Sequence, residues 1–223
     1  MPESGACVAD GAGTVGERGG VDNGTPGVAT ARDSVSAASI DGSAGFVAQD
    51  AIATAYGTFT INRNGGWYYR LNDDNAAVQA LNAGRTLHDR VTITTTGGTA
   101  AEIDITIEGA NDAAVITGTT RDTVIEKGGV ANGTPGDATA SGNLDVTDID
   151  SAATFVARTN APTEYGTFSI DATGSWTYKL DDDKVIVQSL DAGGRRYDRV
   201  TVVTADGTSK VIDITIKGPM TRR

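Results

Sequence analysis

Carboxylate and amide side chains in three segments of the 223-residue chain are its clearest candidates for chemistry. The segments are Asn111-Asp112, Asp148-Ile149-Asp150 and Asp206. Ca²⁺ takes about six to eight oxygen ligands, mostly carboxylates and carbonyls, and no single segment offers that many. If the fold brings the three segments to one end of a domain, together they form a Ca²⁺ site. The alternative is that these acids are solvated turn residues, because Asp is common in turns.

Catalysis lacks the residues that it needs. The only histidine is His88, and its counterpart in the internal repeat described below is Tyr197. Ser, Cys and His therefore do not recur as a triad-like set. The paired carboxylates Asp73-Asp74 and Asp182-Asp183 stand where a short helix needs an N-terminal cap. We therefore expect that the chain is not an enzyme.

An internal repeat organises the chain. Tyr56-Gly57-Thr58-Phe59 returns at residues 165–168, and Ile103-Asp104-Ile105-Thr106-Ile107 returns at residues 212–216. Both pairs differ by the same number of positions (165 − 56 = 212 − 103 = 109). The chain is therefore a tandem repeat without insertions, which predicts two domains. We expect the first at residues 1–110, opening with a Gly- and Ala-rich arm at residues 1–12, and the second at residues 111–223.

Short alternating apolar runs, separated by turns, predict an all-β fold. Asn64-Gly65 indicates a hairpin turn, and Asn72-Asp73-Asp74-Asn75 should cap one short helix that ends at Gly84. The arm residues Ala6-Cys7-Val8 align with Val115-Ile116-Thr117, so they should form a weak first strand. In the first copy we expect strands near residues 34–40, 46–48, 56–61, 66–71, 89–95 and 102–108. This pattern predicts two tandem immunoglobulin-like or cadherin-like Greek-key β-sandwiches, each with one short helix.

The two tryptophans admit two interpretations. Trp67 and Trp176 lie at equivalent positions in alternating Gly-x-Trp-x-Tyr-x-Leu runs. Burial of one indole supplies much of a small sandwich core. The alternative is an exposed ring that stacks on a sugar, which would make the chain a carbohydrate-binding module. We expect the core role.

Composition limits the partners and the compartment. The net charge is −11, so nucleic acid and anionic membrane surfaces are not expected partners. No apolar run is long enough for membrane insertion. Cys7 is the only cysteine, which excludes an internal disulfide and leaves the compartment open.

Five motifs occur twice and in the same order in this chain. They are Tyr-Gly-Thr-Phe, Gly-x-Trp-x-Tyr-x-Leu, Val-Gln-x-Leu-x-Ala-Gly, Asp-Arg-Val-Thr and Ile-Asp-Ile-Thr-Ile-x-Gly. With Gly109-Ala110-Asn111-Asp112 closing the first copy, the chain resembles the VCBS repeats of large bacterial surface proteins and RTX-type adhesins. The resemblance implies cadherin-like sandwich modules, an extracellular or cell-surface location, and a role in adhesion or biofilm structure.

The neighbouring cadherin family implies how such a site is built. Cadherins place linker Asn-Asp, a downstream Asp-x-Asp and upstream acids around Ca²⁺ between domains. By that resemblance Glu17 and Asp89 are the upstream ligands, beside Asn111, Asp112, Asp148, Asp150 and Asp206. The repeat provides an internal comparison, since the first-copy counterparts of Asp148 and Asp206 are Ser39 and Gly97.

These observations together predict a non-enzymatic extracellular structural or adhesive module, braced by Ca²⁺ and able to assemble into fibres. Its expected partners are calcium, other copies of the chain through strand addition or end-to-end stacking, and a cell-surface or matrix glycan. The alternative is a carbohydrate-binding accessory module of a secreted protein.

Overall fold

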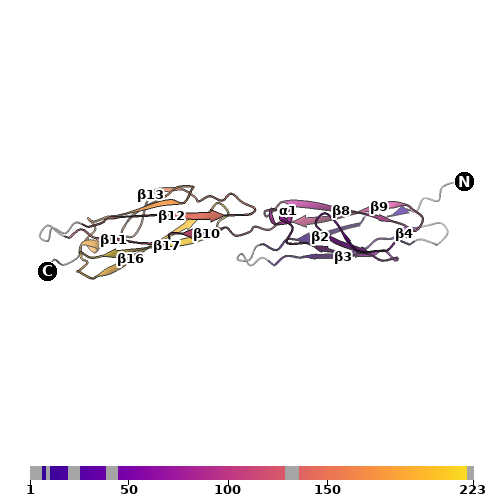
Figure 1. Cartoon of the computed structure of the whole chain (residues 1–223), viewed down its shortest axis with the longest axis horizontal. Coiled ribbons are helices and arrows are strands. Elements are labelled where there is room, and N and C mark those ends of the chain that lie inside the picture. Colours follow the sequence, from indigo (N-terminus) through magenta and orange to yellow (C-terminus); the bar gives the residue numbers. More distant parts are fainter. Residues whose placement is uncertain (1–6, 9–10, 20–25, 39–44, 129–135, 220–223) are drawn as a thin grey trace. The chain divides into compact units, whose positions relative to one another are not determined.

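The computed structural model describes residues 7–8, 11–19, 26–38, 45–128 and 136–219. The chain divides into two compact units, residues 1–113 and 114–223, whereas the sequence predicts a boundary after residue 110. In the described parts, each unit consists of β-strands and one four-residue helix (Figure 1). The predicted all-β fold class is confirmed.

Unit 1 is a sandwich of two sheets. One sheet has the order β2-β9-β8 and the other β3-β7-β6-β5, while β1 pairs with β4. The parallel pairing of β2 with β9 places the first long strand beside the last, and a bridge between Phe46 and Thr95 extends the first sheet. The elements are β1 (Cys7–Val8), β2 (Gly11–Gly16), β3 (Thr30–Ser34), β4 (Ala37–Ala38), β5 (Gln49–Ala53), β6 (Gly57–Ile61), β7 (Gly66–Leu71), α1 (Ala76–Gln79), β8 (Thr86–Thr94) and β9 (Ala100–Glu108).

Unit 2 repeats this plan. Its sheets have the orders β11-β17-β16 and β10-β12-β15-β14-β13, and β11 runs parallel to β17. A bridge between Phe155 and Thr204 is the counterpart of the bridge in unit 1. The elements are β10 (Val115–Gly118), β11 (Arg121–Ile125), β12 (Thr139–Thr147), β13 (Arg158–Pro162), β14 (Gly166–Ile170), β15 (Ser175–Leu180), α2 (Val185–Gln188), β16 (Arg195–Val203) and β17 (Ser209–Lys217).

Alternating side chains of the facing sheets fill each core. In β9 the burial alternates, with Ile103, Ile105 and Ile107 fully buried. Trp67 is 3% exposed and Trp176 is 0% exposed, so the core role predicted for both is confirmed. Each indole stacks on a phenylalanine one strand away, with centroids 6.1 Å apart in unit 1 and 6.0 Å apart in unit 2. Burial on this scale excludes these rings as sugar-stacking platforms.

The helix caps agree only in part with the prediction. Asn75 caps α1, since its side chain accepts a hydrogen bond from Ala77 N at 2.9 Å. The cap of α2 is Lys184, which makes no side-chain capping bond, so the predicted carboxylate cap of the second helix is wrong. Both helices are also only one turn long. In α1 the C-cap is Ala80, four residues before the predicted stop at Gly84.

The turns follow the sequence closely, and the early strands do not. Gly65 and Gly98 have φ of +86° and +88°, the left-handed backbone that the predicted turns require. In the region 34–40, predicted as one strand, β3 ends at Ser34 and β4 covers only Ala37–Ala38. The strand β5 was not predicted, because it carries a register shift and a residue with positive φ that break its alternation.

The start of the chain is partly strand. β1 pairs with β4 as β10 pairs with β12, so the predicted first strand at Cys7–Val8 is confirmed. β2 begins at Gly11, inside the predicted arm. The rest of the arm lies outside the described residues, as do Asn23, Gly24 and Thr25 of the turn before β3.

Candidate calcium centre

Glu17 lies at the end of unit 1 from which the chain leaves. It is 2% exposed and follows β2, and its backbone N–H donates to Glu108 O at the end of β9. Its carboxylate accepts hydrogen bonds from Gln79 Nε2 at 3.0 Å and from Ala110 N at 3.2 Å. Glu17 therefore ties both α1 and Ala110 to the end of β2. Ala110 is the residue directly before the Asn111-Asp112 segment.

Asp89 is an internal anchor of unit 1. It is 3% exposed, and its Oδ2 accepts from Tyr69 Oη at 2.7 Å and from Tyr56 N at 3.0 Å. Burial and the adjacent Asp89 carboxylate raise the pKa of Tyr69, so the phenol stays protonated and donating. The guanidinium of the neighbouring Arg90 pairs with Asp104, at 3.4 Å. Asp198 makes the same two bonds in unit 2, with Tyr178 and Tyr165.

Asp206 holds the first residues of unit 2. Its carboxylate accepts from the hydroxyls of Thr204 and Thr208, from Thr208 N at 3.1 Å and from Ala114 N at 3.1 Å. Burial alone would raise the pKa of Asp206, but these hydrogen bonds together lower it to about 2. A carboxylate has about four acceptor directions, and four donors use them.

Asp148 and Asp150 form a turn directly after β12. Oδ1 of Asp148 accepts from Asp150 N at 3.1 Å and from Ser151 N at 2.8 Å. Oδ2 of Asp148 is buried and accepts no hydrogen bond from a described residue. Burial raises the pKa of Asp148, the bond from Ser151 N opposes that rise, and the Asp150 carboxyl adds to it. This pair combines an orphaned buried acceptor with a second acid, which is the environment that a bound cation would stabilise.

Ala114 lies between the Asp148–Asp150 turn and Asp206 within unit 2. Val115 faces Thr147 in the β10–β12 ladder, so continuation of the register sets Ala114 opposite Asp148. The same residue donates its N–H to Asp206. Asp148 and Asp206 thus flank one end of β10, and Asp150 is two residues further along the turn.

Asn111 and Asp112 immediately precede this end in the chain. Asp112 is 5% exposed, and Asn111 Nδ2 donates to Asp112 O at 3.0 Å. Two residues span at most about 7 Å, so the Asp112 backbone lies within that distance of Ala114. Among the described residues, no three Asp, Glu, His or Cys side chains converge closely enough to hold an ion by themselves. Main-chain oxygens and water would have to complete any Ca²⁺ shell.

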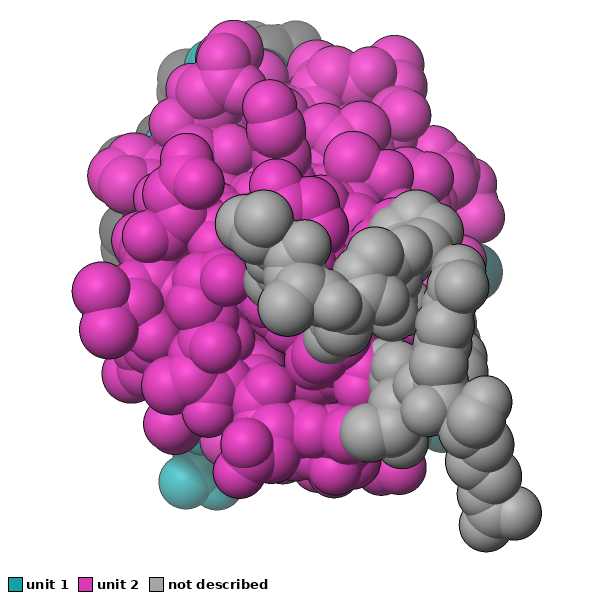
Figure 2. All heavy atoms as spheres, turned by 90° about the vertical axis from the view of Figure 1, so that its left-hand side faces the viewer, with its two compact units in different colours: residues 1–113 teal, residues 114–223 magenta. Residues whose placement is uncertain are grey.

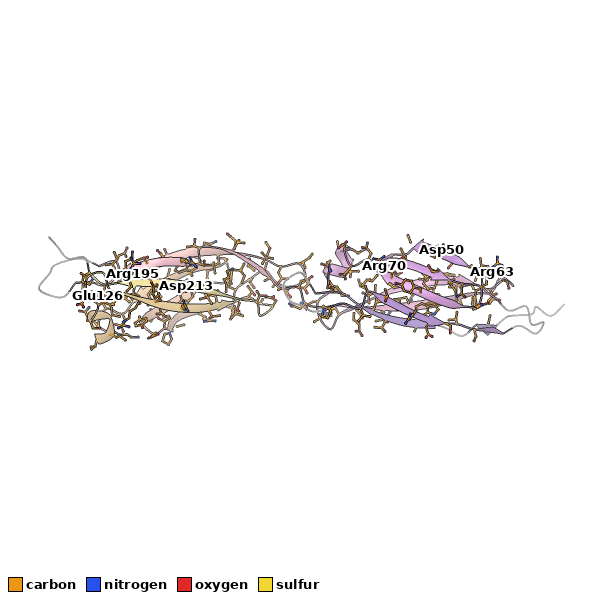
Figure 3. All side chains as sticks on the ribbon, turned by 90° about the horizontal axis from the view of Figure 1, so that it is seen from below. Asp50, Arg63, Arg70, Glu126, Arg195 and Asp213 are labelled. Carbon is orange, nitrogen blue, oxygen red and sulfur yellow. The ribbon has the colours of Figure 1, made fainter. Side chains whose placement is uncertain are left out.

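Sequence reasoning missed another buried acid, Glu126, at one end of unit 2 (Figure 3). It is the counterpart of Glu17 and is 2% exposed, and its Oε1 accepts from Gln188 Nε2 at 2.8 Å. Its Oε2 is buried without a hydrogen-bond donor among the described residues. The residue aligned with Ala110 is Pro219, which has no N–H to donate. Figure 2 looks onto this end of unit 2. Comparison of Ala110 with Pro219 across the 109-residue repeat would have revealed the missing N–H from the sequence.

Comparison with known proteins gives a likeness of fold. No family model and no curated protein matches the chain. Similar solved structures include cadherin domains 3–6 of protocadherin gamma B2 (12% identity, TM-score 0.45, 96% of this chain and 47% of that one). Others are Drosophila N-cadherin EC1–4 (16%, 0.45, 94% and 47%) and mouse cadherin-23 EC22–24 (12%, 0.47, 96% and 67%).

The chain spans about half the length of the first two structures. At these identities and TM-scores the likeness concerns the architecture of the sandwiches and assigns no activity. No helix within the described parts of the chain is long and apolar enough to span a membrane.

Proposed function

We propose that this chain is a non-enzymatic, extracellular structural or adhesive module whose connecting segment is stiffened by Ca²⁺. The observation that carries the proposal is the buried Oδ2 of Asp148, which accepts no hydrogen bond from a described residue and lies beside the carboxyl of Asp150. Ca²⁺ bound there would neutralise the charge of two adjacent carboxyls. The resemblance to VCBS repeats supports a bacterial cell surface or biofilm as its setting.

The proposed ligands differ from the predicted set in their roles. Asp148 and Asp150 bind the ion directly, and Asn111 and Asp112 contribute oxygens because they precede Ala114 so closely. Asp206 acts as an anchor for the same segment, because its acceptor directions are already used. Glu17 and Asp89 act in the same way in unit 1, the former by holding Ala110 and the latter by holding the two tyrosines.

The segment from Ala110 to Ala114 is held at both of its ends, each by its own unit. Glu17 accepts from Ala110 N, and Asp206 accepts from Ala114 N. Asn111, Asp112 and Ala113 connect the two anchors. An ion that binds Asn111 and Asp112 together with the Asp148–Asp150 turn therefore acts on the short segment between the two anchors. That is the basis for a mechanical role.

Self-association belongs to the same proposal and involves β8 and β16, each of which lies at an edge of its sheet and is bridged next to its last residue. Among the other edge strands, β5 and β13 each contain a register shift and a positive-φ residue, Ala51 and Asn160 with φ of 47°. Such breaks disrupt the regular ladder that a second strand would need. β8 and β16 are nine residues long and carry no such break, so strand addition into a fibre would use them.

The test is thermal unfolding of the full chain in Ca²⁺ and in chelator. Each unit has one tryptophan, so Trp67→Phe and Trp176→Phe backgrounds report unit 2 and unit 1 separately. At about one hundred times the dissociation constant, the liganded unit gains roughly 2.7 kcal/mol. We expect that gain in unit 2, and we expect its loss in the Asp148→Asn, Asp150→Asn double variant.

The matched control is Asp191→Asn, which removes an exposed carboxylate of unit 2 from the turn before β16. This variant should keep the full response to Ca²⁺. An unchanged midpoint of the parent chain in millimolar Ca²⁺, or a response that survives in the double variant, would show that these acids are turn residues and nothing more.

A further inference from the structure

The same cavity occurs once in each unit. In unit 1 its volume is about 540 Å³, and Arg18, Thr58, Arg70 and the loop Asn72-Asp73-Asp74 give it its polar groups. In unit 2 a cavity of about 400 Å³ is lined by eight of the described residues, and each stands 109 positions after a lining residue of the first. The fold therefore builds this cavity twice, from equivalent positions.

One contact, present in both units, fixes the walls. Arg18 N donates to Asp73 Oδ1 at 3.1 Å, and the Arg18 guanidinium lies 3.4 Å from Asp73 Oδ2. In unit 2, Lys127 N donates to Asp182 Oδ1 at 3.3 Å. Asp73 and Asp182 thus tie the loop before each helix to the residue that follows the buried glutamate of the same unit. This explains why Asp73 and Asp182 do not cap the helices.

Two further charged side chains in each cavity have no structural task. Arg70 faces Thr58 across the β6–β7 ladder, and Asp74 stands in the loop beyond (Arg70 is labelled in Figure 3). Both are exposed, and neither side chain forms an ion pair or a hydrogen bond with a described residue. Their counterparts are Lys179, which faces Thr167, and Asp183. Packing therefore accounts for the shape of the cavity and leaves a cation, a hydroxyl and a carboxylate available in each copy.

The differences between the copies exclude a charge-selective site. Among the described lining residues, the four charged groups of the first cavity sum to zero, while two lysines and three aspartates give the second a formal charge of −1. Both arginines of the first become lysines in the second, which removes the planar fork that binds carboxylate or phosphate in a bidentate manner. An anion would therefore find no shared recognition in the two units.

We propose that both cavities bind neutral sugar rings, such as hexose units of a matrix or cell-surface glycan. A sugar hydroxyl donates to a carboxylate and accepts from a lysine or an arginine, so the substitutions between the copies leave its recognition intact. The volumes fall in the range of small-ligand sites, roughly 300–1,000 Å³. This inference is independent of Ca²⁺, and it gives an adhesive module two chemically equivalent contacts with a polysaccharide.

The affinity of one cavity should be low. None of the described residues that line it is aromatic, so they offer no ring on which a sugar could stack. Two sites on one chain, and more on an assembled array, raise the overall binding by roughly 10²–10⁴-fold when a polymer reaches several of them. Weak sites in series suit reversible attachment to a polysaccharide.

The experiment is an NMR titration of the ¹⁵N-labelled full chain in chelator with glucose, galactose, mannose and their short oligosaccharides. We expect at least one of these sugars, in the high millimolar range, to shift the amide signals of both cavities. Arg70→Ala should weaken the response of unit 1 by roughly tenfold and leave unit 2 unchanged, and Lys179→Ala should do the reverse. Arg90→Ala is the control, because it removes an exposed arginine that lines neither cavity.

Glycine and sodium sulfate test the other ligand classes. Equal or larger shifts with glycine would assign the cavities to zwitterions, and with sulfate to anions, and either result would overturn the proposal. The absence of any sugar-dependent shift, or shifts that persist in both cavity variants, would overturn it as well. Because the titration contains chelator, failure here leaves the Ca²⁺ proposal untouched, and the reverse also holds.

Discussion

Adding a backbone N–H at position 219 should stabilise unit 2, and removing the equivalent N–H at position 110 should destabilise unit 1. In unit 1 both oxygens of buried Glu17 accept hydrogen bonds, the second from Ala110 N. In unit 2 Pro219 takes that position and Oε2 of buried Glu126 accepts none from a described residue. The chain follows the same path at both places, since Gly109 N donates to Arg85 O and Gly218 N to Gly194 O, each at 3.0 Å. Pro219→Ala should therefore return the missing donor.

The magnitude follows from two opposing terms. A buried acceptor without a partner costs about 1–3 kcal/mol, and a hydrogen bond to a charged group contributes about 1.5–3 kcal/mol. Removing a proline loosens the unfolded chain and costs about 0.4–1 kcal/mol. Pro219→Ala should therefore stabilise unit 2 by about 1–2 kcal/mol, and the reverse change Ala110→Pro should destabilise unit 1 by a similar amount.

Fluorescence-detected unfolding in the single-tryptophan backgrounds separates the two units. A gain of about 1 kcal/mol raises the midpoint of a domain of this size by roughly 4–8 °C. Pro162→Ala is the control for proline removal alone, because Pro162 lies in the edge strand β13 and is exposed. This control should lose a few tenths of a kcal/mol or more. If Pro219→Ala behaves like Pro162→Ala, the orphaned oxygen carries no energetic penalty and our reasoning is wrong.

The pH dependence provides a second readout of the same exchange. Burial raises the pKa of Glu126 above its usual 4.5, and the Asp182 charge raises it further, against the Gln188 hydrogen bond. The folded state then holds the proton at pH values where the unfolded chain has released it. Unit 2 is therefore more stable below its folded pKa and loses that stability as the pH rises through this value. Pro219→Ala should flatten this loss, because a backbone N–H favours the charged carboxylate.

Three further predictions concern single side chains. Trp176→Ala should destabilise unit 2 by about 3–5 kcal/mol, measured by chemical denaturation with circular dichroism, because it empties the largest fully buried site. Tyr178→Phe should cost about 1.5–3 kcal/mol, since Asp198 loses a buried donor, and a loss below 0.5 kcal/mol would contradict the anchoring role. Asp206→Ala should remove stability that unit 2 has above pH 3.8 and loses as the pH falls toward about 2, and an unchanged acid unfolding profile would refute this.

The repeat and the alternating strands made most of the fold predictable. Trp67 and Trp176 are buried as the strand pattern requires, and the glycine turns at Gly65 and Gly98 have the expected backbone. β5 was invisible, because a positive φ at Ala51 shifts its register and destroys the period of two. The N-terminal cap of α2 was predicted wrongly because Asp182 bonds to Lys127 N, a partner 55 residues away that no local motif indicates.

The candidate site was less predictable, because a sequence shows which acids are present and not how many donors each one meets. Asp206 and Asp148 appear equivalent as turn aspartates, yet four donors surround the former and one oxygen of the latter has none among the described residues. The distinction depends on Thr204, Thr208 and the N–H of Ala114, which fold around Asp206 alone. A carboxylate that meets enough donors becomes an anchor, as Asp206 does with its lowered pKa, and one that does not remains open to a cation. The number of donors also distinguishes Glu17 from Glu126. Glu17 accepts from Ala110 N, whereas Pro219 offers no N–H at the equivalent position and Oε2 of Glu126 has no donor among the described residues.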